Sequence, residues 1–284
     1  MSTEMHSRHG MSTSKTNYSN GEANMSGTST LERPLLRIAA VAIPIGLVLQ
    51  ILMETLHPSK AAPNDSAAAF QEYAMSKTWT IVHIGQFFAA LLVALALVAL
   101  ARSLTRQGGV TGALAVIGGA TAILVAAIFA VQMAVDGVAL KATIDTWINA
   151  TEAADKASAY QVAEGIRALE KGLSGFFHLA NGTTLLVLGL AITLGRNYPR
   201  WLGWVGAVSG IGLLAGGIAT AQTGFSPEAG TVLLGPVVLG GIFLIGSAVC
   251  MWRRSSTGDR GPAPRNILCW AACSRNHEPC PDHS

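Results

Sequence analysis

An uninterrupted apolar segment between Lys77 and Arg102 constrains this chain more than any other feature. The segment covers residues 79–102, WTIVHIGQFFAALLVALALVALAR, and contains no lysine, arginine, aspartate or glutamate before its last residue. A helix rises about 1.5 Å per residue, so about 20 residues cross the roughly 30 Å hydrocarbon core of a bilayer. The segment therefore predicts a transmembrane helix, relative to which the rest of the chain can be placed.

The composition of the whole chain indicates the same class. Of the 284 residues, 50% are hydrophobic and only 12% are charged, and the mean hydropathy is +0.43. Soluble domains have about 25% charged residues. No basic segment with interleaved aromatic residues indicates nucleic-acid binding. The composition therefore indicates an integral membrane protein with the lipid bilayer as its surroundings.

The cysteines do not change this interpretation. All four lie near the C-terminus and cannot form the disulfide framework of a secreted domain. Three of them, together with two histidines, resemble a metal-binding tract in composition, but their spacing fits no common zinc motif. We therefore interpret the C-terminal tail as incidental. The residues concerned are Cys250, Cys269, Cys273, Cys280, His277 and His283.

Five further apolar segments predict an all-α fold, a polytopic bundle of six transmembrane helices. The predicted spans are residues 35–53, 79–102, 110–135, 173–194, 201–221 and 232–252. Residues 1–30 and 255–284 are polar, without the periodicity that could bury a face, so we expect two disordered tails around a transmembrane domain of residues 31–254. Pro44 is expected to kink the first span.

Between the third and fourth spans, the pattern predicts an external helical hairpin. Apolar residues continue the third helix at helical spacing: Leu140, Ile144 and Trp147. The helix is expected to break at residues 149–151. Residues 152–172 then predict an amphipathic helix, whose apolar stripe consists of Ala159, Val162, Ile166 and Leu169. We expect the two apolar stripes of the hairpin to face each other.

Basic residues distinguish the two ends of the predicted bundle. With a cytoplasmic N-terminus, 13 of the 19 lysines and arginines lie on the cytoplasmic side, in agreement with the positive-inside rule. Each short connection on that side carries two arginines and no acidic residue. We therefore predict a multi-pass protein of the bacterial plasma membrane with both termini in the cytoplasm.

Glycines in the fifth span predict close helix contacts. Gly206 with Gly210, and Gly212 with Gly216, form two successive pairs of small residues four positions apart. Such pairs let helices approach closely where lipid supplies no hydrophobic drive between them. We expect these glycines to pack the fifth helix on the sixth. The alternative is a homo-oligomer formed through the same four residues.

Polar side chains gather near the predicted outer ends of the spans, whereas the inner halves are almost purely apolar. Spacings of three or four residues place them on one face of each helix. Because polar groups at this depth are costly unless paired or hydrated, we expect these faces to surround an outward-opening pocket. The candidate pocket residues are Glu54, His57, His83, Gln86, Gln132, Asp136, His178 and Asn181, with Gln50 and Gln222 nearby.

Four interpretations of this polar belt stay open. A vestibule that binds a small molecule or lipid headgroup is favoured over a transport path, because polar features near the midplane are missing. A bound metal such as zinc would make the protein a membrane-embedded hydrolase. Its candidate ligands are His57, His83 and His178 with Glu54 or Asp136. His83 and His178 are also candidates for haem ligation. The fourth interpretation is a structural or assembly protein whose polar layer is satisfied by hydrogen bonds, without catalysis.

A charged group on the external helix is a secondary candidate. Glu164, Arg167 and Glu170 are spaced three residues apart, on one side of that helix. We favour a solvated charged face. The alternative is an arginine clamp, flanked by two carboxylates, that caps the pocket.

Several motifs occur in order over roughly residues 33–252: HPSKAAPND, FQEYAMSKTWTIVHIGQF, VQMAVDGVALK, EGIRALEKGLSGFF, YPRWLGWVG and GFS. They resemble a family of bacterial, largely actinobacterial, six-span membrane proteins of unknown function. The resemblance implies no activity, substrate or cofactor. It favours an outer-face site, because it implies that the following residues belong to the family pattern: His57, Trp79, His83, Gln86, Gln132, Asp136, Glu164, Arg167 and Glu170.

Overall fold

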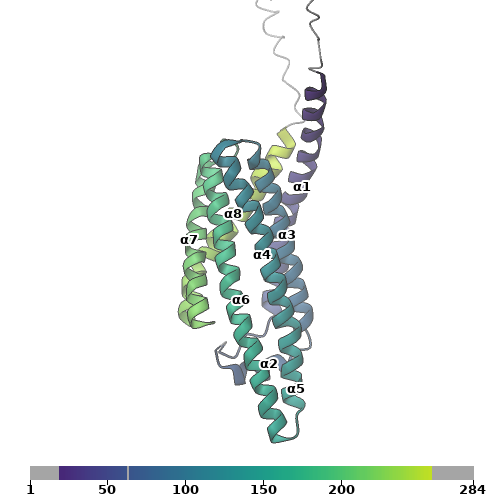
Figure 1. Cartoon of the computed structure of the whole chain (residues 1–284), viewed down its shortest axis with the longest axis vertical. Helices are drawn as coiled ribbons and strands as arrows, with labels where there is room; N and C mark the ends of the chain where they lie inside the picture. The colour runs from purple at the N-terminus through teal and green to yellow at the C-terminus, as the bar shows by residue number, and fades with distance from the viewer. Residues whose placement is uncertain (1–18, 63, 258–284) are drawn as a thin grey trace, which may run out of the picture.

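The computed structural model describes residues 19–62 and 64–257, with side chains described for 31–62 and 64–256. Every regular element in these ranges is a helix, which confirms the predicted all-α class. In chain order (Figure 1) the elements are α1 (Ser19–Leu56), α2 (Ser66–Met75), α3 (Trp79–Thr105), α4 (Gly109–Ala134), the π-helix η1 (Val135–Leu140), α5 (Lys141–Asn149), α6 (Ala153–Leu194), α7 (Arg200–Thr223) and α8 (Pro227–Thr257).

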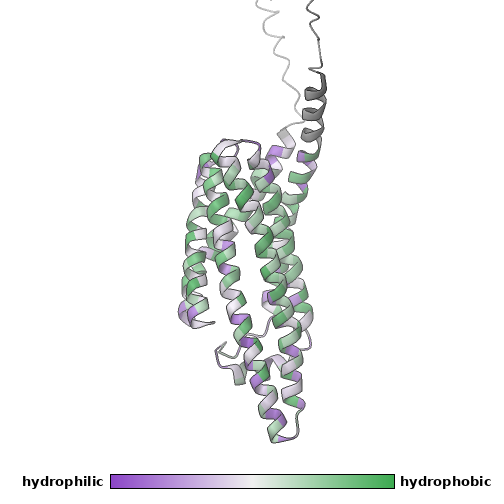
Figure 2. Cartoon of the chain, viewed as in Figure 1, coloured by the Kyte–Doolittle hydropathy of each residue, from purple (hydrophilic) through white to green (hydrophobic). Residues whose placement is uncertain are grey.

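Six helices in the described part of the chain are long and apolar enough to cross a membrane, as predicted. Their bounds are Leu31–Leu56, Trp79–Thr105, Gly109–Asn149, Ala153–Leu194, Arg200–Thr223 and Pro227–Ser256. Apolar residues dominate along these helices, and polar residues concentrate toward their ends (Figure 2). The third and fourth have 41 and 42 residues, a length of roughly 60 Å, about twice the thickness of the hydrocarbon core.

The six long helices form a closed ring in chain order. Each packs on the next one along the chain, with α4 on α6 across the hairpin, and α8 returns to pack on α1. The start of α1 and the end of α8 lie at the same end of the ring (Figure 1). The main hydrophobic core lies toward that end and includes Leu36, Leu104, Ile192, Leu202 and Met251. The opposite end, where the hairpin begins, holds the buried polar side chains of His83, Asp136 and Glu170.

The predicted helical hairpin is present. The helix that begins with α4 continues through η1 into α5, and α6 returns from Ala153 without a break. The hairpin projects beyond the ends of α7 (Figure 1). Leu140 and Ile144 are fully buried, as their spacing predicted.

The buried face of α6 in the hairpin differs from the prediction. Val162 and Leu169 are 54% and 55% exposed, whereas Ala163, Arg167 and Glu170 are at most 3% exposed. The cause is a second hydrophobic cluster, built between α2, the start of α3 and the hairpin. Its fully buried members include Phe70, Trp79, Leu140, Ile144 and Ala163. The face of α6 that meets this cluster is therefore set by α2 and α3 as well as by α5.

The ends of the chain differ in part from the expected tails. α1 begins at Ser19, so the second part of the expected disordered N-terminal tail is helical. Elongation of a helix costs less than its nucleation, which lets an apolar span extend into polar sequence. Residues 1–18 and 258–284 lie outside the described residues. The cysteines and histidines of the C-terminal tail that were considered as a metal-binding tract lie in the second of these ranges.

The α7 glycines mediate contacts inside the chain. A Cβ at Gly210 would lie 2.4 Å from a backbone nitrogen of α6, and one at Gly206 would lie 2.6 Å from a ring carbon of α8. Gly212 and Gly216 face side chains of α8 at still shorter distances. The predicted pairs of small residues therefore let α7 approach two neighbours, α6 and α8, and not α8 alone.

We expect Gly210→Ala to lower the free energy of unfolding by about 1–3 kcal/mol, because the added methyl meets backbone atoms that cannot move aside. Gly165→Ala on the exposed side of α6 is the matched control. A Cβ there meets no atom within 4 Å, and no proline follows it, so helix propensity should raise stability by about 0.5–1 kcal/mol. Thermal unfolding in a mild detergent measures both variants. Equal shifts would contradict the close approach of α6 and α7.

Candidate functional site

Two of the predicted polar residues form a buried pair where the hairpin leaves the ring. His83 on α3 and Asp136 in η1 have side chains that are 2% and 8% exposed, and His83 Nε2 lies 2.9 Å from Asp136 Oδ2. His83 Nδ1 lies 2.7 Å from the carbonyl oxygen of Trp79. A carbonyl oxygen only accepts, so the Nδ1 atom carries a hydrogen. The Nε2 atom therefore either shares a proton with Asp136 or offers its lone pair to a ligand.

The π-helical turn η1 directs Asp136 toward α3. Such turns are frequent at functional sites. Two α3 side chains donate hydrogen bonds to carbonyl oxygens of this turn: Trp79 Nε1 to Asp136 and Thr80 Oγ1 to Gly137, each at 3.0 Å. A Cβ at Gly137 would lie 2.4 Å from the Cβ of His83. A glycine at this position is therefore required for the close approach of the two helices.

His57, in the connection after α1, adds a third group to this pair. Its Nδ1 lies 2.8 Å from the carbonyl oxygen of Pro58, so Nδ1 donates this hydrogen bond. Its ring lies against Trp79 and His83, with centroid distances of 4.9 and 5.3 Å. Burial, followed by the neighbouring His83, lowers the pKa of His57. The ring is therefore neutral at pH 7, with the lone pair on Nε2.

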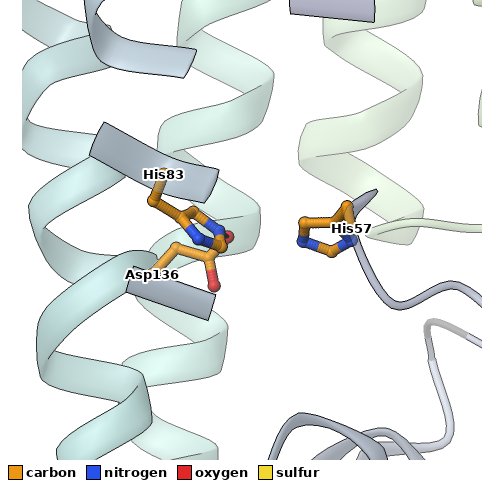
Figure 3. Close-up of side chains that lie close together, drawn as sticks. All are labelled: His57, His83 and Asp136. Atoms are coloured by element: carbon orange, nitrogen blue, oxygen red, sulfur yellow. Dashed lines mark hydrogen bonds and ion pairs between the residues drawn. The ribbon is translucent and has the colours of Figure 1, made fainter. Parts of the chain in front are cut away.

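We refer to His57, His83 and Asp136 as the histidine–aspartate cluster. One ligand atom from each lies within 4.8 Å of the other two, and Figure 3 shows His57 across a gap from the His83–Asp136 pair. Asp136 Oδ1 has no hydrogen-bond partner among the described residues. Two imidazole nitrogens and a carboxylate are ligands of zinc and other transition metals. The arrangement is therefore chemically suited to hold a metal ion.

Arg167 and Glu170 form a buried ion pair beside the cluster. Arg167 Nη1 lies 2.5 Å from Glu170 Oε2, and Nη2 donates to the Tyr73 hydroxyl at 3.2 Å. The guanidinium also lies over the Phe225 ring, 4.9 Å from its centroid. The favoured prediction of a solvated face is therefore wrong for these two residues, because α2 and the α7–α8 connection cover them. Glu164, the third member of that group, is half-buried.

The electrostatic surroundings of the ion pair link it to the cluster. Asp136 interacts electrostatically with both Arg167 and Glu170, and His83 interacts with Glu170. Burial, as the largest effect, raises the pKa of the Tyr73 hydroxyl, which keeps this hydroxyl protonated at pH 7. The site thus combines two imidazoles, two carboxylates and one guanidinium within a mostly apolar surrounding.

The other predicted pocket residues take separate positions. Gln86 donates to the exposed Glu54 at 3.3 Å, and Gln132 is buried with an Oε1 that has no partner among the described residues. His178 and Asn181 line a cavity inside the ring. His178 does not belong to the histidine–aspartate cluster, so the predicted trio of three histidines does not form. Asp136, which the metal hypothesis offered as a further ligand beside the three histidines, is the third member of the cluster instead of His178.

Four residues of the site were not identified from the sequence: Tyr73, Thr80, Gly137 and Phe225. Tyr73 and Phe225 come from segments far from Arg167 in sequence, and no local pattern connects them with it. The sequence did carry a signal for Gly137, because glycine in an apolar helix is typical of a close approach between two helices.

Comparison of the chain with protein-family models, with curated proteins and with solved structures found no match. The geometry of the cluster, and of the ring that holds it, is therefore the basis for a functional assignment.

Arg167→Met is expected to lower the free energy of unfolding by about 3–5 kcal/mol, because it leaves the buried Glu170 carboxylate without its partner. Lys141→Met is the control. The Lys141–Asp145 pair is partly exposed, and such pairs contribute about 1 kcal/mol or less. A double variant, Arg167→Met with Glu170→Leu, should recover much of the loss. Unfolding in detergent measures all three, and similar losses in the two single variants would contradict a buried ion pair.

Proposed function

We propose that the histidine–aspartate cluster binds a divalent metal ion, with zinc as the best candidate, and that the protein is a metal-dependent hydrolase. The supporting observation is the convergence of two imidazoles and a carboxylate, with each imidazole Nδ1 held by a backbone carbonyl. Metal-binding histidines almost always donate their second ring N–H to such a partner, which sets the tautomer and the ring orientation. Six apolar helices make the protein an integral membrane protein.

Metal binding requires only a small adjustment of the cluster. Zinc binds nitrogen and oxygen at roughly 2.0–2.2 Å, so tetrahedral ligands lie roughly 3.4 Å apart. The 2.9 Å between His83 Nε2 and Asp136 Oδ2 is close to that separation, and the ion takes the place of the proton between them. His57 closes the remaining distance. It lies in a connection between helices, where the backbone can shift more easily than within a helix.

Three protein ligands leave one position of a zinc ion open for water, as in catalytic sites, and the metal promotes deprotonation of that water. In the hydrolysis, the water oxygen forms a bond to the carbonyl carbon of an ester or amide. The bond to the alcohol or amine breaks, and the leaving group takes up a proton from the water. Arg167, which interacts electrostatically with Asp136, supplies positive charge for the oxyanion of the transition state.

We further propose that the protein lies in the bacterial plasma membrane with the cluster facing outward and both termini in the cytoplasm. At the ring end remote from the cluster, the α3–α4 and α6–α7 connections and the adjoining helix ends carry arginines and no acidic residue. These arginines are Arg102, Arg106, Arg196 and Arg200. An excess of basic residues in short connections favours a cytoplasmic location for that end.

Protein purified in mild detergent and dialysed against zinc is expected to hold about one zinc ion per chain. His83→Ala should lower the zinc content at least about tenfold, because it removes one of the three ligands. His178→Ala is the matched control, since it removes a histidine of the ring cavity and should leave the zinc content unchanged. Elemental mass spectrometry measures the metal. A metal-free wild type, or equal losses in the two variants, would contradict the proposed site.

The same preparation separates catalysis from binding. Hydrolysis of a p-nitrophenyl ester should stop when EDTA removes the metal and should return when zinc is added back. The His83→Ala variant should stay inactive under both conditions. Stoichiometric zinc without EDTA-sensitive hydrolysis would overturn the hydrolase and assign the cluster to ligand binding, the vestibule function predicted from the sequence.

Cysteine labelling in intact cells tests the orientation. Ala154 in the hairpin and Arg196 in the α6–α7 connection are both exposed. In a variant whose native cysteines are replaced by serine, a membrane-impermeant maleimide should label Ala154→Cys and spare Arg196→Cys. Both positions should react after the cells are permeabilised. The reverse pattern in intact cells would place the cluster in the cytoplasm.

A further inference from the structure

The ring of helices surrounds a partly open cavity of about 280 Å³. Each of the six long helices contributes to its wall, for example through Gly46, Ala90, Val125, Leu185, Leu213 and Gly241. This volume is near the lower end of the range for small-molecule pockets, which begins at roughly 300 Å³. On α3 the wall runs from Ala89 to Leu97, roughly 12 Å along the helix. The cavity is therefore long and narrow.

The wall is apolar apart from one end. Its polar members are Gln50, His178 and Asn181. Gln50 lies near the end of α1, and His178 and Asn181 lie on α6 closer to Arg167 than the apolar cavity residue Leu185. These positions put all three polar residues at the end of the cavity that faces the hairpin. His178 Nδ1 is buried and has no hydrogen-bond partner among the described residues.

The cavity and the functional site follow one another along the ring axis. On four helices, the last cavity residue and a residue of the site are separated by about two turns, roughly 10 Å. The pairs are Gln50 and His57 after α1, Ala89 and His83 on α3, Phe129 and Asp136 on α4 and η1, and Phe177 and Glu170 on α6. Because this separation is the same on four helices, the cluster lies about two helical turns beyond the end of the cavity that faces the hairpin.

The side chains between the ring cavity and the histidine–aspartate cluster are polar. Gln86 and Gln132 each lie one turn beyond the cavity on α3 and α4, and Ser174 occupies the equivalent turn of α6. Gln132 and Ser174 are buried, and the Gln132 Oε1 has no partner among the described residues. An apolar channel, a polar layer and a cluster of metal ligands therefore succeed one another in this order.

We propose that the substrate is a single-chain fatty acyl ester or amide, whose acyl chain occupies the ring cavity while its carbonyl group meets the histidine–aspartate cluster. This assignment rests on the proposed hydrolase function. A narrow apolar channel fits one hydrocarbon chain and excludes lipids with two chains or a bulky ring system. The cavity and the cluster follow one another in the same order as the alkyl chain and the carbonyl group of such a molecule. Hydrolysis leaves a free fatty acid with its chain in the cavity.

The test uses a diazirine-bearing palmitate as the probe, with protein in mild detergent. After irradiation, the crosslinks should map to cavity-wall residues such as Ala90, Val93, Gly240 and Leu244, and an excess of unlabelled palmitate should suppress the labelling. Gly241→Phe should lower the labelling at least about tenfold, because the ring fills the channel. Gly230→Phe is the matched control on the same helix. Neither glycine has an atom within 4 Å of an added Cβ, but only Gly241 lines the ring cavity.

The zinc content of the same samples shows whether a negative result refutes the acyl-chain assignment or the proposed metal site. Crosslinks confined to lipid-facing residues such as Val238, or equal losses in the two variants, would overturn the acyl-chain assignment even when zinc is bound normally. Specific labelling of the cavity wall in a protein that binds no zinc would refute the metal site and retain the chain in the cavity. Folding of both variants is checked by their zinc content and by their elution in size-exclusion chromatography.

Discussion

A polar side chain inside an apolar helix bundle needs a partner, and the hydrogen bond between His83 and Asp136 meets this need at the centre of the protein. The two residues lie on different helices, so their bond also joins α3 to the helix that becomes the hairpin. Trp79 and Thr80 strengthen the same junction by donating to carbonyl oxygens of the π-helical turn. The orientation of the hairpin, and with it the position of Arg167, follows from this junction.

Several segments around that junction each contribute one side chain to the site. His57 comes from the connection after α1, Tyr73 from α2 and Phe225 from the connection between α7 and α8. These segments cover the side of α6 that carries Arg167 and Glu170, and they exclude water from the ion pair. Low polarity around a charge strengthens its interactions. The same cover therefore stabilises the fold and makes the cluster a favourable place for chemistry on a polarised carbonyl group.

The sequence correctly predicted how far along each helix the candidate residues lie, but not which neighbouring helix or cavity each side chain faces. His57, His83 and Asp136 were chosen because each lies near the same end of its span, and the structure brings these three together. His178 was chosen on the same ground, yet it lines the ring cavity. Depth in a helix follows from the position of a residue in an apolar segment. The side of the helix that faces a given neighbour depends on rotation about the helix axis, which the periodicity of a nearly all-apolar span does not reveal.

The sequence by itself determined the helical class, the six apolar spans, the hairpin and the clustering of polar residues near one end, because hydropathy and helical periodicity are local properties. The tertiary structure decided which polar faces meet, that Arg167 and Glu170 are buried, and that the ring leaves a cavity between its helices. Those features depend on contacts between segments distant in sequence, such as glycines that admit a neighbouring helix at Gly137 and Gly210. Packing of this kind is a property of pairs of surfaces, and neither surface specifies it alone.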